Sequence, residues 1–306
     1  MLKSVFTIIV TYNGMKWIER CLRSIHNQSH VIIVDNNSTD GTVEFIESNF
    51  SDIILLKQNV NLGFGKANNI GMKYALKNNA NAVFLINQDV YADKNCISKL
   101  LSISKSNPEY GIISPIHMSS KGKEMDRYFS FCAHKNELFK VEKTDNDSIL
   151  YDVPMVNGAA WFVPINTINI VGGFDPIFYH YGEDHNYCQR ILFHHLKIGI
   201  ASNIFIRHDR ESRVKKEVIL FSEAYFKKYG NQMKINHADI NIEYFDSIRL
   251  KQKNKYLKNI LKAVISFNYK NVFGYIKQYK LIDPIFTEIV NSRQVTKIQG
   301  PQYIVE

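Results

Sequence analysis

The sequence predicts an α/β domain whose mainly parallel sheet is flanked by helices, followed by a helical extension. Three observations support this prediction. Short β-branched apolar runs alternate with segments of helical periodicity within the first 86 residues. Clusters of polar residues follow those runs, at 11–13, 35–40 and 87–89. The balance of charge changes near residue 214, which divides the chain into a main domain, 1–214, and an extension, 215–306.

The alternation of strand and helix can be followed along the chain. The predicted strands are 4–11, 31–34, 53–56 and 82–86, and the helical patterns between them begin at Met15, Val43 and Ala67. Parallel strands joined by helices bring their carboxyl ends to one edge of the sheet, and α/β domains bind their ligands beyond that edge. Because each polar cluster follows a strand, the sequence predicts a ligand crevice there.

The composition is that of a folded protein with a large core. Of the 306 residues, 45% are hydrophobic and 12% are aromatic. The four cysteines lie far apart and form no C-x-x-C pair, which argues against a zinc site and a disulfide framework and favours the reducing cytoplasm. The apolar run at 5–10 is too short for a signal peptide or a membrane span, so we interpret it as a strand.

The net charge of +9 belongs mostly to the extension. Residues 215–306 contain sixteen Lys and Arg against eight Asp and Glu, whereas residues 1–214 contain 22 against 21. From Leu257 to Tyr279, apolar residues follow helical spacing with lysines between them. Such a helix either lies in a membrane interface or packs its apolar side on the main domain. A nucleic-acid binder that uses this basic segment is an alternative of another class, which the near-neutral main domain does not favour.

The polar clusters do not match any of three standard ligand-binding motifs. Gly63 and Gly65 begin a dinucleotide fingerprint, but Asn68 stands at the position of its third glycine. A P-loop fails because Ala67 replaces the required Ser or Thr. The acidic loop at 35–41 lacks the closing Glu of a calcium hand. The crevice therefore needs another way to hold phosphates, and a metal ion is the natural candidate.

An acidic pair, Glu183 and Asp184, follows a run of aromatic residues and stands at the start of a predicted helix. Gly182 sets the turn before it. A carboxylate at a helix N-terminus meets the positive end of the helix dipole and can stay ionised beside apolar rings. That environment suits a general base, and it equally suits a helix cap with an aromatic core behind it.

Six segments, in this order, resemble the inverting GT-A type glycosyltransferases that include the bacterial rhamnosyltransferases. They read TIIVTYN, VDNNSTDGT, NLGFGKANN, FLINQDV, NGAAWFVP and GGFDPIFYHYGED, within about residues 4–213. The resemblance implies a Rossmann-like GT-A fold and transfer of a sugar from a pyrimidine nucleotide diphosphate. It makes dTDP-rhamnose or a UDP-hexose the leading donors. It also implies a glycan or lipid-linked glycan acceptor in the synthesis of a bacterial surface polysaccharide such as an O-antigen.

The resemblance assigns donor binding to residues at the strand ends. Asp35 would accept a hydrogen bond from the pyrimidine imide N–H, because a carboxylate only accepts; the alternative is a turn-forming aspartate. Trp161 would offer its face to a sugar ring, or would simply enter a buried strand. Lys66 lies either near the phosphates or in solvent. The predicted donor-binding residues are Thr11, Tyr12, Asn13, Asp35, Asn61, Gly63, Lys66, Asn69, Asn87 and Trp161.

The family's Asp-x-Asp metal motif corresponds here to Asn87-Gln88-Asp89, so only Asp89 keeps its charge. One carboxylate with diphosphate oxygens and water can still hold Mg²⁺ or Mn²⁺. His208 aligns with a late family histidine that completes the metal or diphosphate shell, the alternative being a structural histidine. The resemblance therefore implies a divalent metal at Asp89 and His208.

The resemblance assigns the general base to Asp184, which would take the proton of the attacking acceptor hydroxyl. Glu183 would orient the acceptor or a neighbouring backbone group, and His185 is a rival base. Two alternatives keep the fold without sugar transfer: an inactive scaffold or carbohydrate-binding protein, and a sugar nucleotidyltransferase. The latter should have a Gly-rich, Arg-bearing phosphate loop, which residues 12–14 do not supply. We expect a cytoplasmic enzyme, peripheral on the inner face of the plasma membrane if the extension binds lipid.

Overall fold

The structure is a computed structural model that describes residues 2–135, 150–210, 217–243 and 245–304. The chain forms two compact units, one of residues 1–213 with 299–306 and one of residues 214–298. The predicted boundary near residue 214 lies outside the described residues. The charge shift predicts an extension that runs to the end of the chain, but the segment after residue 298 belongs to the first unit. There Gly173 N donates to Gln302 O (2.8 Å), and the Tyr303 hydroxyl donates to Asp175 Oδ2 (3.3 Å).

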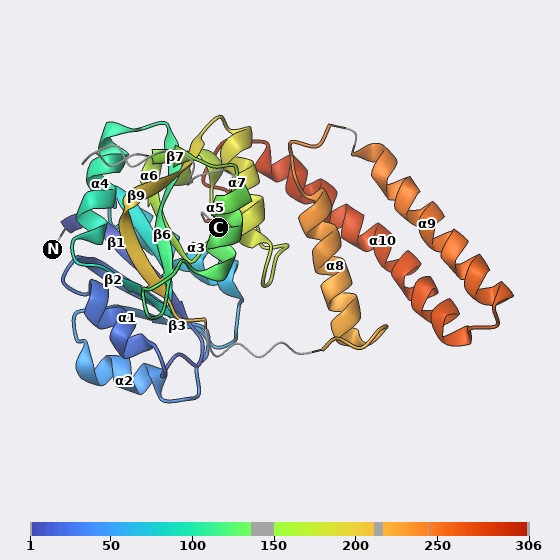
Figure 1. Cartoon of the computed structure of the whole chain (residues 1–306), viewed down its shortest axis with the longest axis horizontal. Helices are drawn as coiled ribbons and strands as arrows, with labels where there is room; N and C mark the ends of the chain where they lie inside the picture. Colours follow the sequence, from blue (N-terminus) through green and yellow to red (C-terminus); the bar gives the residue numbers. More distant parts are fainter. Residues whose placement is uncertain (1, 136–149, 211–216, 244, 305–306) are drawn as a thin grey trace. The chain divides into compact units, whose positions relative to one another are not determined.

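All four predicted strands form, and they pair in parallel at one side of the sheet (Figure 1). They are β1 (Leu2–Thr11), β2 (Ser29–Asp35), β3 (Ile54–Lys57) and β4 (Ala82–Asn87), in the spatial order β3-β2-β1-β4. Thr11 pairs with Asp35, and Val10 pairs with Asn87 on the other side. The strands therefore end almost level, and the polar residues that follow them meet at one edge, as the sequence predicts.

The other half of the sheet is mixed. Its strands are β8 (Ala160–Pro164), β6 (Tyr110–Ser119), β9 (Lys197–His208), β5 (Val90–Ala92) and β7 (Leu150–Asp152). β8 runs antiparallel between β4 and β6, β6 and β9 are parallel, and both β5 and β7 pair antiparallel with β9. The pairing of Val90 with His208 brings Asp89 next to the end of β9. The predicted α/β class with a helical extension is confirmed.

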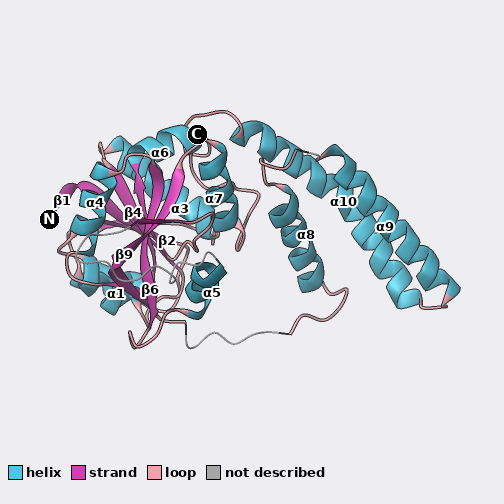
Figure 2. Ribbon diagram, turned by 45° about the horizontal axis from the view of Figure 1, so that its top comes forward, coloured by secondary structure: helices cyan, strands magenta, loops and turns pink. Residues whose placement is uncertain are grey.

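Helices cover both faces of this sheet, so that the first unit has three layers (Figure 2). The helices are α1 (Ile18–Ile25), α2 (Thr42–Asn49), α3 (Phe64–Lys77), α4 (Cys96–Ser106), α5 (Arg127–Lys135), α6 (Ile165–Val171) and α7 (Glu183–Phe193). Alternation along β1 divides the core: Ile8 belongs to the cluster that contains α3, α6 and α7, and Ile9 to the cluster that contains α1 and α4. A Cβ at Gly71 of α3 would lie 2.5 Å from the Ile8 side chain, so glycine allows this close packing.

The described part of the second unit contains three helices, α8 (Glu223–His237), α9 (Asp246–Ile265) and α10 (Tyr269–Thr296). The single helix predicted from Leu257 to Tyr279 is wrong, because the chain turns at 266–268. The Asn268 side chain caps the new helix by accepting from Asn271 N (3.2 Å). Lys253 of α9 donates to Asp283 of α10 (2.7 Å), which joins the two helices. None of the described helices combines the length and the apolar composition that a bilayer span requires.

Candidate active site

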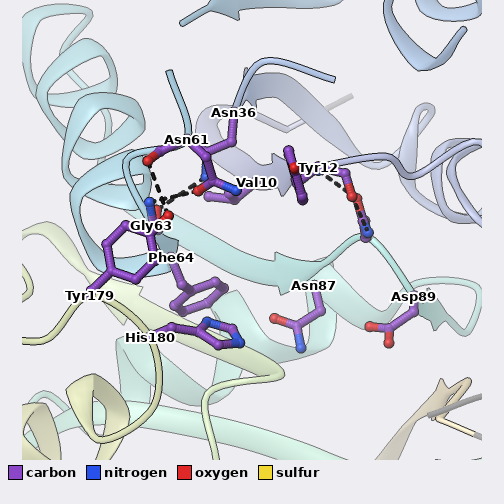
Figure 3. Close-up of a pocket in the computed structure, with 11 residues that line it drawn as sticks. Val10, Tyr12, Asn36, Asn61, Gly63, Phe64, Asn87, Asp89, Tyr179 and His180 are labelled. Atoms are coloured by element: carbon purple, nitrogen blue, oxygen red, sulfur yellow. Dashed lines mark hydrogen bonds between the residues drawn. The ribbon is translucent and has the colours of Figure 1, made fainter. Parts of the chain in front are cut away.

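A cavity of about 370 Å³ opens at the carboxyl ends of β1, β2 and β4 (Figure 3). Loops after these strands, the start of α3 and the loop before α7 supply its lining. The lining residues are Val10, Tyr12, Asn36, Asn61, Gly63, Phe64, Asn87, Gln88, Asp89, Tyr179 and His180. Five of the predicted donor and metal residues are among them: Tyr12, Asn61, Gly63, Asn87 and Asp89. Figure 3 shows Asn36 and Asn61 towards one end of the cavity and Asp89 towards the other.

A side-chain amide joins the loops that follow β1 and β4. Gln88 Oε1 accepts from Tyr12 N (3.0 Å), and Gln88 Nε2 donates to Tyr12 O (3.3 Å). A glutamine can donate and accept at once, which a carboxylate cannot. A Cβ at Gly14 would lie 2.4 Å from Gln88 Oε1, so only glycine leaves room for this contact. Gln88 thereby fixes the backbone of Tyr12, a residue that is 48% exposed.

Asp35 is buried behind the cavity wall and is already hydrogen bonded. Its Oδ1 accepts from the hydroxyls of Thr11 (2.9 Å) and Ser38 (2.6 Å), and its Oδ2 accepts from Ser38 N (3.0 Å). Asn13 extends the same network, because its Oδ1 accepts from Thr39 N (2.9 Å). None of the three predicted residues Thr11, Asn13 and Asp35 lines the cavity. They hold its strand ends in place, and the contact of Asp35 with a pyrimidine stays a prediction.

The loop before α7 closes against the loop before α3. Gly63 has a φ of 81°, a left-handed backbone that favours glycine, and an added Cβ would lie 2.0 Å from Tyr179 O. Asn36 Nδ2 donates to Gly63 O (3.1 Å), and Asn61 Oδ1 accepts from Gly63 N (2.9 Å). The Tyr179 hydroxyl donates to Asn61 O (3.2 Å). These contacts, drawn in part in Figure 3, place Tyr179 in the cavity wall.

Two predicted donor-binding residues have other roles in the structure. Asn69 is buried in α3, and its side chain bonds both backbone groups of Phe174, with Nδ2 donating (2.8 Å) and Oδ1 accepting (2.7 Å). Trp161 is fully buried and stacks on Phe174 with ring centroids 6.1 Å apart, so the prediction that its face meets a sugar is wrong. Lys66 is exposed on α3 and does not line the cavity. Asn69 and Trp161 both shape the segment that leads to the carboxylate pair.

Asp89 and His208 meet at the end of the cavity where β5 pairs with β9. His208 Nε2 lies 3.3 Å from Asp89 Oδ1, and its Nδ1 lies 3.7 Å from Asp126 Oδ2. Neither ring nitrogen of the buried His208 has a hydrogen-bond partner among the described residues. An imidazole nitrogen and a carboxylate oxygen at this separation fit two neighbouring positions around one divalent cation. The described residues contain no cluster of three His, Cys, Asp or Glu able to hold a metal. Substrate oxygens and water would have to supply the other ligands.

The two acidic residues at the start of α7 lie in different environments. Asp184 is half-buried; its Oδ1 accepts from His185 N (2.8 Å) and its Oδ2 from Gly158 N (3.3 Å). Glu183 is buried, and its Oε2 has no hydrogen-bond partner among the described residues. Burial and the charge of Asp184 raise the pKa of Glu183 from 4.5 to about 8. Glu183 therefore holds a proton at pH 7, which makes Asp184 the better candidate for a general base.

Neither member of the pair lines the cavity itself. Burial raises the pKa of the Tyr128 hydroxyl in α5, and the charge of Asp184 adds to this shift. Sequence reasoning missed six lining residues: Val10, Asn36, Phe64, Gln88, Tyr179 and His180. Gln88 lies inside the Asn-Gln-Asp motif, and Tyr179 and His180 lie in the aromatic run before the acidic pair. Proximity to a recognised motif was therefore the signal that could have found them.

Comparisons with known proteins agree with this geometry. The family model described as glycosyl transferase family 2 matches residues 6–163. The dTDP-rhamnosyl transferase RfbF of Shigella flexneri is 23% identical over 210 residues, which cover 68% of this chain and 70% of that protein. Among solved structures, S. aureus TarS 1–349 with UDP-GlcNAc has a TM-score of 0.56 at 13% identity, covering 96% of this chain and 90% of TarS. GalNAc-T7 has the same TM-score and identity, covering 77% of this chain and 50% of its own.

The matched region contains the strands whose ends surround the cavity. It runs from β1 through β4 to β8, and its loops carry Tyr12, Asn61 and Asp89. The structural neighbours share the GT-A arrangement of sheet and helices. Since the family model covers more than half of the sequence, the chain belongs to glycosyl transferase family 2 and is a GT-A glycosyltransferase that uses a nucleotide-sugar donor.

Proposed function

We propose that this chain is an inverting glycosyltransferase that moves rhamnose or a hexose from a dTDP or UDP donor to a glycan or lipid-linked glycan acceptor. Bacterial surface polysaccharide synthesis, for example of an O-antigen, is the setting that we infer. The relative named as a dTDP-rhamnosyl transferase supports rhamnose as the first sugar to test. The observation that carries the proposal is the cavity at the strand ends, because it brings together five residues that the family resemblance assigns to the donor and its metal.

The cavity suits a nucleoside diphosphate in size and in chemistry. A volume of about 370 Å³ lies within the range of small-molecule sites. The exposed ring of Tyr12 offers a face for a base, and the amides of Asn36 and Asn61 lie beside it. At the other end stands Asp89, and the lining contains no Lys or Arg within the described residues. An anionic diphosphate beside a carboxylate needs a cation between them.

We assign that cation to Asp89 and His208, with Mg²⁺ or Mn²⁺ as the candidates. A bound divalent ion would stabilise the negative charge of the departing diphosphate. His208 is suited to ligation because its ring is buried, turned towards Asp89 and without a hydrogen bond to either nitrogen among the described residues. Replacing either residue should therefore weaken metal-dependent donor binding and leave the fold intact.

We assign the general base to Asp184. It is half-buried and held by two backbone N–H groups, from Gly158 and His185, so its carboxylate has a fixed orientation. In an inverting transfer a single base takes the proton of the acceptor hydroxyl, and no carboxylate nucleophile is needed. Glu183, which is buried and protonated at neutral pH, would orient the acceptor or a neighbouring backbone group.

The test is release of nucleoside diphosphate from a panel of dTDP-, UDP- and GDP-sugars, with Mg²⁺, with Mn²⁺ and with a chelator. Wild type is compared with Asp89→Ala, Asp184→Asn and the control Asp52→Asn, a surface carboxylate paired with His26. We expect turnover of one pyrimidine donor, loss in chelator and in both site variants, and full activity in the control.

Other outcomes would replace the proposal. Metal-dependent binding of a donor without turnover by any acceptor tested would indicate a carbohydrate-binding scaffold. Formation of a sugar nucleotide from a nucleoside triphosphate and a sugar phosphate would indicate a nucleotidyltransferase. Equal turnover in chelator would remove Asp89 and His208 from the metal role while leaving the transferase in place.

A further inference from the structure

The turn between α9 and α10 exposes an unusual amount of apolar surface. Seven large apolar side chains there are 48% to 77% exposed, and together they define what we call the α9–α10 tip: Leu257, Leu261, Val264, Ile265, Phe267, Tyr269 and Phe273. Isolated exposed apolar residues are ordinary, but a contiguous group of this kind marks an interaction site. Figure 1 shows the tip where the two helices of the second unit join.

The apolar residues of the tip are not the packing face of the hairpin. Tyr256 and Ala263 of α9 are buried, and the Tyr256 hydroxyl accepts from Gln278 of α10 (3.3 Å). Leu257, Leu261 and Val264 follow helical spacing on a separate, exposed stripe of α9. The helices therefore bury one apolar face against each other and leave a second one in solvent.

The turn itself directs an aromatic ring outwards. Phe267 is 77% exposed and has a φ of 53°, a left-handed conformation that is rare for a bulky residue. The neighbouring turn position is Asn268, which caps α10. A phenylalanine that is 77% exposed buries little of its ring against the hairpin, so we look for its partner outside the chain.

The charge around the tip has a single sign. Residues 251–282 contain eight lysines and no Asp or Glu. Lys258, Lys262 and Lys270 are exposed between the apolar residues of the tip. A surface helix of a soluble protein normally mixes both signs. A second copy of the same tip would bring lysines against lysines, which disfavours self-association through this surface.

We propose that the α9–α10 tip inserts into the interface of a lipid bilayer that carries anionic headgroups. Such a surface offers negative charge to the lysines and an apolar layer to the leucine, valine and phenylalanine side chains at the same depth. Tyr269 fits this setting because its ring is apolar and its hydroxyl remains polar. The tip would anchor the enzyme beside acceptors that are themselves held in a membrane.

The experiment is co-sedimentation of the full chain with phosphatidylcholine vesicles, with and without about one quarter phosphatidylglycerol, at low and high salt. Each lysine near an anionic surface contributes about fivefold to binding. We therefore expect Lys258→Glu, Lys262→Glu and Lys270→Glu together to weaken binding to the anionic vesicles by more than a hundredfold. The matched control replaces three exposed lysines of the first unit, Lys94, Lys99 and Lys105, by glutamate. This variant should retain vesicle binding.

Apolar insertion is tested separately from charge. Leu261→Ser, Phe267→Ser and Phe273→Ser together should weaken vesicle binding at least tenfold, including at high salt, whereas Val60→Ser, an equally exposed position of the first unit, should not. Absence of wild-type binding to anionic vesicles would overturn the proposal. So would tighter binding to DNA than to vesicles, or a wild-type dimer that the serine triple variant converts to monomers. Co-sedimentation does not depend on sugar transfer, so its result tests the membrane proposal independently of the proposed reaction.

Discussion

The two sides of the active site are built in different ways. At the strand ends, polar groups are hydrogen bonded to one another: Asp35 accepts three hydrogen bonds, and Gln88 joins two loops through Tyr12. At the start of α7, Glu183 is buried beside Asp184 with one oxygen unpartnered among the described residues and a raised pKa. A satisfied network keeps a rigid shape, whereas a buried, perturbed carboxyl pair is typical of a place where protons move. We therefore propose that donor binding and proton transfer are divided between these two regions.

The sharpest test of this division is Asp184→Asn. The amide keeps an acceptor for His185 N and about the same volume, but it cannot take a proton from the acceptor hydroxyl. A general base contributes about 10² to 10⁴ in rate, so kcat for transfer should fall by that factor while the Kd of the donor stays within about twofold. Initial-rate assays of sugar transfer measure kcat, and calorimetric titration of the donor measures Kd.

The control for that experiment is His185→Gln, which removes the rival base. It should leave kcat within a few fold of wild type. A loss in His185→Gln as large as that in Asp184→Asn would move the base to the histidine. An Asp184→Asn variant that no longer binds the donor would show that the two regions are not separate.

Substitutions of Trp161 test whether this residue serves in the hydrophobic core or in sugar binding. It stacks on Phe174 and lies against Tyr187, with ring centroids 5.9 Å apart in the second pair. Trp161→Ala should lower the free energy of unfolding by about 3–5 kcal/mol, as expected for a fully buried aromatic residue. Trp161→Phe should cost less and leave the KM of donor and acceptor unchanged. Urea unfolding and steady-state kinetics check both, and a tenfold rise in KM for Trp161→Phe at unchanged stability would restore the sugar contact.

Glu183 makes stability depend on pH. Its pKa is raised from 4.5 in the unfolded chain to about 8 in the folded one, so the folded state holds the extra proton between those values. The stabilisation is complete below pH 4.5 and is lost as the pH rises through 8. Each unit of pKa difference corresponds to about 1.4 kcal/mol. We therefore expect wild type to lose on the order of 4 kcal/mol, relative to Glu183→Gln, between pH 5 and pH 8.5.

Urea unfolding of both proteins at pH 5, 7 and 8.5 measures this difference, since glutamine imitates the protonated carboxyl and does not titrate. Parallel pH profiles for wild type and Glu183→Gln would mean that Glu183 ionises normally. In that case Glu183 would regain the role of a second charged group beside Asp184, and the contrast between the two sides of the site would disappear.

The donor side was predictable from sequence because its geometry follows from local rules. Alternating strands and helices fix where parallel strands end, and the polar residues after them must meet there. The contacts that Asn69 and Trp161 make in the structure were not predictable, because both residues contact Phe174, which lies more than ten residues away in the sequence. The difference in burial between Glu183 and Asp184 also depends on tertiary contacts. The sequence of two adjacent acidic residues does not indicate which side chain is buried.

The break between α9 and α10 shows the same limit. Apolar spacing continues from Leu257 through Phe273 as if in one helix. The turn at 266–268 contains neither glycine nor proline, the residues that usually mark such a break. The reversal is accompanied by the Asn268 cap and by contacts between the two helices, such as the hydrogen bond from Gln278 to Tyr256. Periodicity alone predicts helical residues well and cannot predict where a helix reverses.

Substitution of Lys66 should have the smallest effect on donor binding. It tests whether this residue belongs to the donor side of the site. It follows Gly65 in α3, is exposed and is not part of the cavity lining, unlike its neighbours Gly63 and Phe64. If shape and metal hold the diphosphate, Lys66→Met should change the KM of the donor less than threefold, and an exposed positive charge should contribute no more than a surface lysine elsewhere. The comparison variant is Lys73→Met on the same helix. A tenfold rise in KM for Lys66→Met alone would place the lysine at the phosphates. It would show that a flexible side chain completes a site whose lining, among the residues that the structure describes, contains no Lys or Arg.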